Sequence, residues 1–332
     1  MSGESLLEVR NLRVEYAGNR NTVHAVNGVS LSLGQGQTLG LVGETGCGKS
    51  TVARALIGLL PPPGRVVSGE VILGGVDLLA AGQRALRGIR GRDVAMIFQD
   101  PLTALNPLLT IGFQIGEALR GAGLGKKARR ARTRELLQLV GLPDAATRMD
   151  AYPHELSGGM RQRVMIAMAI SCGPRLLIAD EPTTALDVTV QAQVLDLLSE
   201  LQDELGMALL LVSHDLGIMA QVADRVHVMY AGYTVESGSV EDVLLAPGHP
   251  YTEGLIGSIA QIDEPRPPRL RGIPGSAPTL FSEATGCPFR PRCPVAVELC
   301  AGANPPLMPL GRTHDSACWV KTAEHDHTKV GT

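Results

Sequence analysis

The stretch that most constrains the fold is a glycine-rich loop with the sequence Gly43-Glu44-Thr45-Gly46-Cys47-Gly48-Lys49-Ser50-Thr51. It lies between an apolar run at residues 38–42, which predicts a short buried strand, and a helical pattern that begins at Lys49. Backbone N–H groups of such a loop can surround a phosphate, and the positive end of the helix dipole faces that anion. We therefore predict that the loop binds a nucleoside triphosphate, with Lys49 at the β- and γ-phosphates and the Ser50 hydroxyl on Mg²⁺. A glycine-rich turn that matches the pattern by chance is the alternative.

Length and charge restrict the class of protein. The 332 residues allow about two domains, and a net charge of −3 gives no basic field that would indicate nucleic acid as a partner. The one basic cluster, at residues 126–134, is typical of a solvated helix face. No apolar run reaches the ~18 residues that span a bilayer, and the first four residues lack the features of a signal peptide. We expect a cytosolic protein.

Strand-like and helical patterns alternate along most of the chain. Strands are expected at residues 7–16, 25–33, 38–42, 68–73, 94–98, 176–179, 208–212 and 225–230. The first two suggest a small antiparallel sheet beside the nucleotide. Helices are expected from Lys49 to Leu60, where three prolines follow, through most of residues 101–170, and from Val188 to Leu205. The alternation predicts an α/β fold with a mostly parallel sheet.

The last quarter of the chain has a different character. Ten prolines lie between residues 247 and 294 and interrupt any long element. We expect a core domain at residues 1–240, with a helical subdomain at about 100–171, and a separate appended segment at residues 241–332.

Two carboxylates follow the expected strand at residues 176–179. Asp180 and Glu181 stand where a phosphate-loop ATPase needs a Mg²⁺ ligand and a group that orients the attacking water. Acidic residues after a strand are common, so this feature alone is weak evidence.

A second anion site is suggested by Leu156-Ser157-Gly158-Gly159, which precedes a long helical run. It presents a hydroxyl and bare N–H groups at a helix N-terminus. An ordinary serine cap with a glycine turn explains the same residues equally well.

The order of these motifs resembles the nucleotide-binding domain of ABC ATPases over about residues 6–240: the loop at 43–51, Gln99, Leu156-Ser157-Gly158-Gly159, Asp180-Glu181, Ala185-Leu186-Asp187 and His214. The resemblance implies that Ser157, Gly158 and Gly159 clamp the γ-phosphate held by a facing subunit, so that ATP lies in a head-to-tail dimer. Met160 replaces the glutamine most often found there, but the serine and both glycines are intact.

The same resemblance assigns roles to four further residues. Tyr16 would stack on adenine, Gln99 would ligate Mg²⁺ or the water, His214 would contact the γ-phosphate, and Asp187 would couple the two sites of the dimer. Strand packing is the alternative for Tyr16, a polar strand end for Gln99, and helix capping for His214.

Three longer stretches resemble the dipeptide and oligopeptide importer subfamily: Phe98-Gln99-Asp100-Pro101-Leu102-Thr103-Ala104-Leu105-Asn106-Pro107, Tyr152-Pro153-His154-Glu155 and His249-Pro250-Tyr251-Thr252. This resemblance implies an ATPase subunit bound at the cytoplasmic face of the membrane. Its partners would be a second ATPase, often a different chain, two transmembrane permease subunits and, indirectly, an external substrate-binding protein. Residues 101–119 would receive a coupling helix of a permease.

Four of the six cysteines lie together near the C-terminus, at Cys287, Cys293, Cys300 and Cys318. Thiols stay reduced in a cytosolic protein, which favours metal ligation over disulfides. The gaps are longer than the two to four residues typical of zinc knuckles. Resemblance to the peptide-importer subunits implies a 4Fe-4S cluster, with zinc and four unligated thiols as alternatives.

Cys47 occupies a variable position of the loop at a helix start. The helix dipole would lower the pKa of its thiol and make it sensitive to alkylation, whereas a small side chain that merely fills space is the other interpretation.

The sequence thus predicts an ATPase subunit of a peptide importer. Two rival hypotheses stay open: a soluble regulatory or repair ATPase that uses the cysteines as a sensor, and a weakly hydrolysing half of an asymmetric pair. Glutathione-like compounds and metal chelates are alternative cargoes.

Overall fold

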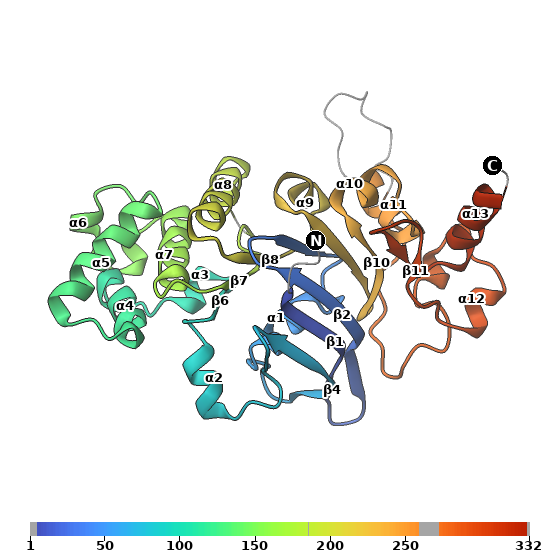
Figure 1. The fold of residues 1–332 in the computed structure, drawn as a ribbon, viewed down its shortest axis with the longest axis horizontal. Helices are drawn as coiled ribbons and strands as arrows, with labels where there is room; N and C mark the ends of the chain where they lie inside the picture. The colour runs from blue at the N-terminus through green and yellow to red at the C-terminus, as the bar shows by residue number, and fades with distance from the viewer. Residues whose placement is uncertain (1–4, 185, 259–271, 331–332) are drawn as a thin grey trace. The chain divides into compact units, whose positions relative to one another are not determined.

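A computed structural model describes residues 5–184, 186–258 and 272–330 (Figure 1). Two compact units divide the chain. Unit 1 contains residues 1–33, 38–79 and 213–332, and unit 2 contains residues 34–37 and 80–212. Among the described helices, none is both long and apolar enough to cross a lipid bilayer.

Unit 1 contains the predicted small antiparallel sheet. Its strands run in the order β2 (Thr22–Gly34), β1 (Ser5–Ala17), β4 (Gly64–Leu73) and β5 (Val76–Asp77). β1 and β4 are antiparallel, with Leu7 opposite Leu73 and Tyr16 opposite Gly64. β1 and β2 are each longer than predicted, since β1 begins two residues earlier and β2 three residues earlier and each ends one residue later.

A second set of strands in unit 1 contains the one that precedes the loop. β3 (Thr38–Val42) is fully buried and pairs in parallel with β9 (Arg225–Tyr230). β10 (Tyr233–Ser239) is antiparallel to β9, and β12 (Asp315–Ser316) and β11 (Met308–Pro309) extend the pairing from the C-terminal segment. The expected boundary between residues 240 and 241 therefore falls inside unit 1, and the compact units divide the chain differently from the expected domains.

The helices of unit 1 are α1 (Lys49–Leu56), α9 (Leu216–Val222), α10 (Val240–Leu245), α11 (Pro250–Gly257), α12 (Leu299–Gly302) and α13 (Trp319–Val330). The prediction that α1 runs to Leu60 and is stopped by prolines is wrong. Gly58 takes a left-handed φ of 64° and donates its N–H to the Ala55 carbonyl, so the helix ends at a glycine cap.

Unit 2 combines parallel strands with most of the helices. β6 (Val94–Ile97) pairs in parallel with β7 (Leu176–Asp180), and β7 with β8 (Ala208–Ser213), as the alternating pattern predicts. β7 is buried along its whole length, which explains its continuous apolar sequence.

The helices of unit 2 lie between residues 83 and 205. They are α2 (Gln83–Ile89), α3 (Pro101–Ala104), α4 (Ile111–Ala118), α5 (Lys126–Leu139), α6 (Ala145–Arg148), α7 (Gly158–Ile170) and α8 (Val188–Leu205), with 3-10 turns η1 (Leu119–Ala122) and η2 (Pro153–Glu155). Within the unit, α4, α5, α6 and α7 gather into one group, the green part of Figure 1. The expectation that residues 101–170 are mostly helical is confirmed.

Candidate nucleotide site and cysteine cavity

Two glycines of the loop at residues 43–51 are required by its backbone. Gly43 has a φ of 155° and Gly48 a φ of 107°, both in the region that favours glycine. A Cβ atom added to Gly43 would lie only 2.2 Å from the Met229 carbonyl oxygen, and one added to Gly48 only 2.4 Å from the Ala25 carbonyl oxygen. The loop is therefore shaped by its own glycines before any ligand arrives.

Lys49 begins α1 and is only 4% exposed. Its Nζ donates to the carbonyl oxygen of Gly43 at 2.7 Å and to that of Glu44 at 3.1 Å, so the ammonium spans the loop. The cap residue Gly48 offers no capping side chain, and no acidic residue lies in the first turn of α1 as described. The positive charge of Lys49 and the positive end of the helix dipole thus reinforce each other at the loop.

Cys47 is 1% exposed. Burial raises the pKa of its thiol, even though the nearby Lys49 charge opposes that effect. The expectation of a low pKa is therefore wrong, because desolvation outweighs the helix dipole. The side chain fills space inside the loop.

Glu44 makes contacts that the sequence analysis did not predict. Its carboxylate forms a two-point ion pair with the Arg292 guanidinium, at 2.6 and 2.8 Å, and its N–H donates to the Tyr251 hydroxyl at 2.7 Å. Both partners come from the C-terminal segment. No spacing rule in the sequence links residue 44 to residue 292.

In unit 2, Asp180 ends β7 and Glu181 follows it directly; the two residues are 0% and 8% exposed. Glu181 has a φ of 49°, a strained backbone for a residue other than glycine. Its Oε2 accepts from Gln99 Nε2 at 3.1 Å and from Thr184 Oγ1 at 2.9 Å. The structure therefore brings Gln99 and Glu181 together, and adds Thr184, which the sequence analysis missed.

Ser157 caps α7, and its Oγ accepts the N–H of Met160 at 3.3 Å. The ordinary cap is thus formed, and Ser157 and Gly158 are also exposed at the helix N-terminus. A Cβ atom on Gly159 would lie 2.7 Å from Val190 Cγ1, so glycine permits close approach to the first turn of α8.

Asp187 caps α8, and its carboxylate accepts the N–H of Val190 at 3.0 Å. Because Gly159 lies against Val190, the N-termini of α7 and α8 are next to each other. Ala185 lies outside the described residues.

Two predicted contact residues of unit 1 have different surroundings. The Tyr16 ring packs against Gly64, since a Cβ there would lie 2.6 Å from Tyr16 Cε1. Strand packing is therefore one of its roles. His214 is exposed, and Asp215 rather than His214 caps α9, so helix capping does not explain the histidine.

Cys287, Cys293, Cys300 and Cys318 line one cavity of about 10 Å³ in unit 1, together with Phe289 and Trp319. None of the six cysteines is in a disulfide. Burial raises the pKa of Cys287 to about 11 and also raises the pKa values of Cys293 and Cys318, and the Cys300 thiol adds to each of these shifts.

Within the described ranges, no three His, Cys, Asp or Glu side chains are arranged as metal ligands. The four thiols nevertheless line one cavity, and a cation would relieve the mutual repulsion of their thiolate forms. The cavity as it stands has room for about one water molecule, so the thiols would have to move apart around a cluster.

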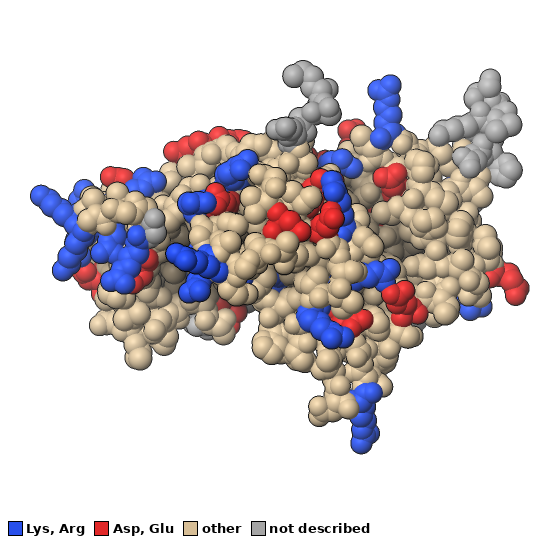
Figure 2. Space-filling model, turned by 60° about the horizontal axis from the view of Figure 1, so that its bottom comes forward, with Lys and Arg blue, Asp and Glu red and all other residues tan. Residues whose placement is uncertain are grey.

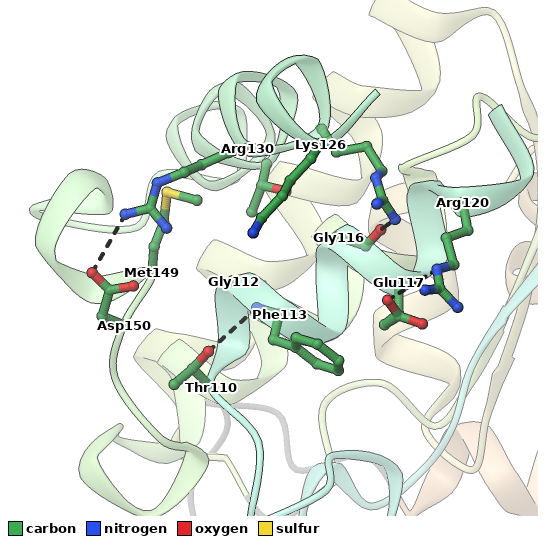
Figure 3. A pocket seen from close by; sticks show the side chains of 12 residues that line it. Thr110, Gly112, Phe113, Gly116, Glu117, Arg120, Lys126, Arg130, Met149 and Asp150 are labelled. Carbon is green, nitrogen blue, oxygen red and sulfur yellow. Dashed lines mark hydrogen bonds and ion pairs between the residues drawn. The ribbon is translucent and has the colours of Figure 1, made fainter. Parts of the chain in front are cut away.

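A surface pocket of about 460 Å³ lies between α4 and α5 of unit 2 (Figure 3). On the α4 side, a Cβ atom on Gly116 would meet nothing within 4 Å, whereas one on Gly112 would lie 2.6 Å from the Met149 carbonyl oxygen. Phe113, between these two glycines, is 51% exposed.

The lining of this pocket carries both charges: Glu117 forms an ion pair with Arg120 at 3.2 Å, Asp150 forms one with Arg130 at 3.5 Å, and Lys126 lies beside them. Figure 2 shows Lys and Arg gathered over this end of unit 2. The basic cluster at residues 126–134 thus forms a solvated helix face, as predicted, but this face also borders a pocket.

Comparisons with known proteins agree with this geometry. Residues 26–184 match the family described as ABC transporter, and residues 235–300 match the C-terminal region of oligopeptide/dipeptide transporters. The chain is 48% identical to the dipeptide transport ATP-binding protein DppD of Bacillus subtilis, over 98% of this chain and 97% of that protein. It is 47% identical to DppD of Escherichia coli, over 95% and 96%.

Among solved structures, the chain is similar to a dimeric ATP-binding cassette in a post-hydrolysis state bound to ADP and Pi. The TM-score is 0.64 at 26% identity, covering 70% of this chain and 98% of that one. The predicted α/β phosphate-loop fold of ABC ATPases is therefore confirmed.

Proposed function

This chain belongs to the ABC transporter ATP-binding family, and from that premise we propose that it is the ATP-hydrolysing subunit of an importer of dipeptides and longer peptides. The observation that carries the proposal is the match to dipeptide transport proteins over nearly the whole chain, including the C-terminal region that marks peptide transporters. A soluble regulatory or repair ATPase is not favoured by these relatives.

The residues of each unit have distinct roles toward ATP in this proposal. Lys49 and the loop N–H groups bind the phosphates in unit 1, and Tyr16 and His214 contact adenine and the γ-phosphate. In unit 2, Glu181, held by Gln99 and Thr184, orients and polarises the attacking water.

Mg²⁺ would be held by Ser50, Gln99 and Asp180, and it would neutralise charge on the transferred phosphoryl group. Asp180 ends β7 as a fully buried carboxylate, and carboxylate oxygens are common Mg²⁺ ligands.

The N-termini of α7 and α8 supply the proposed dimer contacts. Exposed Ser157 and Gly158 and half-buried Gly159 present N–H groups and a hydroxyl that suit the γ-phosphate held by a facing ATPase subunit. Asp187, on the neighbouring helix start, would couple the two sites. The partner is proposed to be a second, different ATPase chain.

The pocket between α4 and α5 is the proposed contact for a transmembrane permease subunit. Its exposed Phe113 and the 82% exposed Leu108 lie within residues 101–119, where a coupling helix was expected. An apolar helix face would match the exposed aromatic ring, and polar residues at its edge would match the mixed border of Lys126 and the paired Arg120 and Arg130. This contact would place the chain peripherally at the cytoplasmic face of the membrane.

The four cysteines are proposed to hold a 4Fe-4S cluster, with zinc as the alternative. Support comes from their convergence on one cavity and from the absence of disulfides among them. Nucleotide chemistry does not need this group, so its proposed role is structural or regulatory.

The experiment that tests the function compares the wild-type chain with Glu181→Gln in complexes purified from the native host. We expect wild type to co-purify with two membrane permeases and to hydrolyse ATP. Glu181→Gln should lower turnover by about 10²-fold or more while ATP still binds, because only water activation is lost. Recovery with DNA or ribosomes instead of permeases would contradict the transport proposal. Unchanged turnover in Glu181→Gln would instead favour a weakly hydrolysing subunit.

A further inference from the structure

We propose that Arg292 is a positioning residue for the phosphate-binding loop. Its guanidinium neutralises the Glu44 carboxylate and holds that side chain in place when ATP binds. The inference rests on the proposed nucleotide site at residues 43–51. It assigns to the cysteine-containing segment a direct effect on nucleotide affinity.

The ion pair between Arg292 and Glu44 has strong geometry. Two nitrogens of the guanidinium contact the two carboxylate oxygens, at 2.6 and 2.8 Å, and the Arg292 side chain is only 7% exposed. Such two-point pairs fix orientation as well as charge. A surface pair with one contact would not hold the loop in this way.

The guanidinium is itself held by the segment around it. It donates to the backbone carbonyl oxygens of Pro274 at 2.8 Å, Gly275 at 3.3 Å and Ile273 at 3.4 Å, and to the Tyr230 hydroxyl at 3.3 Å. Arg292 is thus presented to Glu44 by fixed partners and needs little reorganisation.

Glu44 passes this constraint to the loop by three of its groups. The side chain pairs with Arg292, the N–H donates to the Tyr251 hydroxyl, and the carbonyl oxygen accepts from Lys49 Nζ. Glu44, which the C-terminal segment holds in place, is therefore hydrogen-bonded directly to Lys49, the residue expected to bind phosphate.

An aromatic cluster supports the same segment. Phe289 is buried and packs edge-on against Tyr230, with ring centroids 5.2 Å apart, and it also contacts Tyr251 at 5.4 Å. Phe289 directly precedes the 3-10 helix η3 (Arg290–Arg292), which lies between Cys287 and Cys293. The position of Arg292 is thus tied to that of the two cysteines.

Charge explains why the loop needs this arginine. Glu44 is an anion inside a loop that must bind a polyphosphate, so its unpaired charge would repel the ligand. The paired guanidinium cancels that charge. If Arg292 acted only by packing, removing the Glu44 charge would not compensate for its loss.

The test measures binding of ATP, ADP and adenosine to the purified full chain and three variants: Arg292→Gln, Glu44→Gln and the double variant. Arg292→Gln should raise the Kd for ATP by about five- to tenfold, since it leaves an uncompensated charge at the site. The increase should be smaller for ADP, absent for adenosine, and reduced at high salt. Glu44→Gln alone should lower the ATP Kd severalfold, and the double variant should return close to wild type.

Arg312→Gln is the control, because this exposed arginine also lies in the C-terminal segment but does not line the cysteine cavity. It should bind ATP as wild type does. Arg292→Lys, which keeps the charge, should lose less affinity than Arg292→Gln and serves if the glutamine variant does not fold.

Two results would overturn the inference: an Arg292→Gln variant with wild-type ATP affinity, or a double variant as weak as Arg292→Gln, which would make the role structural. Failure of the wild-type chain itself to bind ATP would remove the proposed site and the inference together. The failure of the inference alone is therefore distinguishable.

Discussion

His227 shows how burial sets the behaviour of one residue. It lies on β9 of unit 1, and its Nδ1 is buried without a hydrogen-bond partner. Burial, with a smaller effect of the Arg225 charge, lowers the pKa of His227 from 6.5 to about 4. The folded chain therefore keeps this imidazole neutral over a pH range in which the unfolded chain protonates it.

This difference predicts a pH dependence of stability. The free energy of unfolding is unaffected by His227 protonation above pH 6.5, where the imidazole is neutral in both states. Between pH 6.5 and 4 the free energy of unfolding falls by roughly 1.4 kcal/mol per pH unit, because only the unfolded state binds the proton. Urea unfolding between pH 7 and 4.5 measures it. His227→Gln should show a shallower loss of stability on acidification, and exposed His154→Gln should keep the wild-type slope. Equal slopes for wild type and His227→Gln would contradict the prediction.

At the scale of elements, α4 combines a buried and an exposed apolar face. Ile111 and Ile115 are buried in unit 2, whereas Phe113 is exposed and lines the pocket beside α5 (Figure 3). Thr110 caps the helix by accepting the Phe113 N–H at 3.4 Å. The exposed ring is therefore fixed on a capped helix, as a docking contact requires.

We predict that Phe113→Glu lowers recovery of permease subunits by more than about tenfold. A central aromatic contact contributes about 2 kcal/mol or more to binding, and the substitution replaces the ring with a carboxylate. ATP binding by the isolated chain should not change. Leu245→Glu is the control, since Leu245 is also highly exposed but lies on α10 of unit 1. Pull-down with tagged permeases measures the effect, and equal recovery for both variants would argue against docking at α4.

At the scale of the whole molecule, the C-terminal segment belongs to the same compact unit as the phosphate-binding loop. β12 pairs with β10, the Leu280 carbonyl oxygen accepts the His24 N–H at 2.9 Å, and Arg292 pairs with Glu44. Changes at the four cysteines should therefore alter the affinity of the nucleotide site for ATP.

Removal of the proposed metal group tests this connection. Protein purified anaerobically should be brown, and chelation or Cys293→Ser should abolish the colour, lower the melting temperature and raise the ATP Kd toward that of Arg292→Gln. Absorbance, metal analysis and nucleotide titration measure these effects. A colourless protein with stoichiometric zinc would contradict the iron proposal, and an unchanged ATP Kd would contradict the coupling.

Much of this protein is determined by local sequence. The strand at residues 38–42, the loop with its glycines and the helix from Val188 to Leu205 follow from apolar periodicity and from backbone needs that few residue types meet. The motifs on them carry the nucleotide chemistry, and their order along the chain predicts the family.

Only the tertiary structure decided which distant residues act together. Local patterns could not reveal that Cys47 is buried with a raised pKa, that Thr184 and Gln99 hold Glu181, or that Arg292 reaches Glu44. Desolvation and ion pairing depend on neighbours brought together by folding, so they leave no spacing in the sequence. The phosphate-binding loop is therefore specified locally, whereas the charge balance within it comes from a segment about 250 residues away.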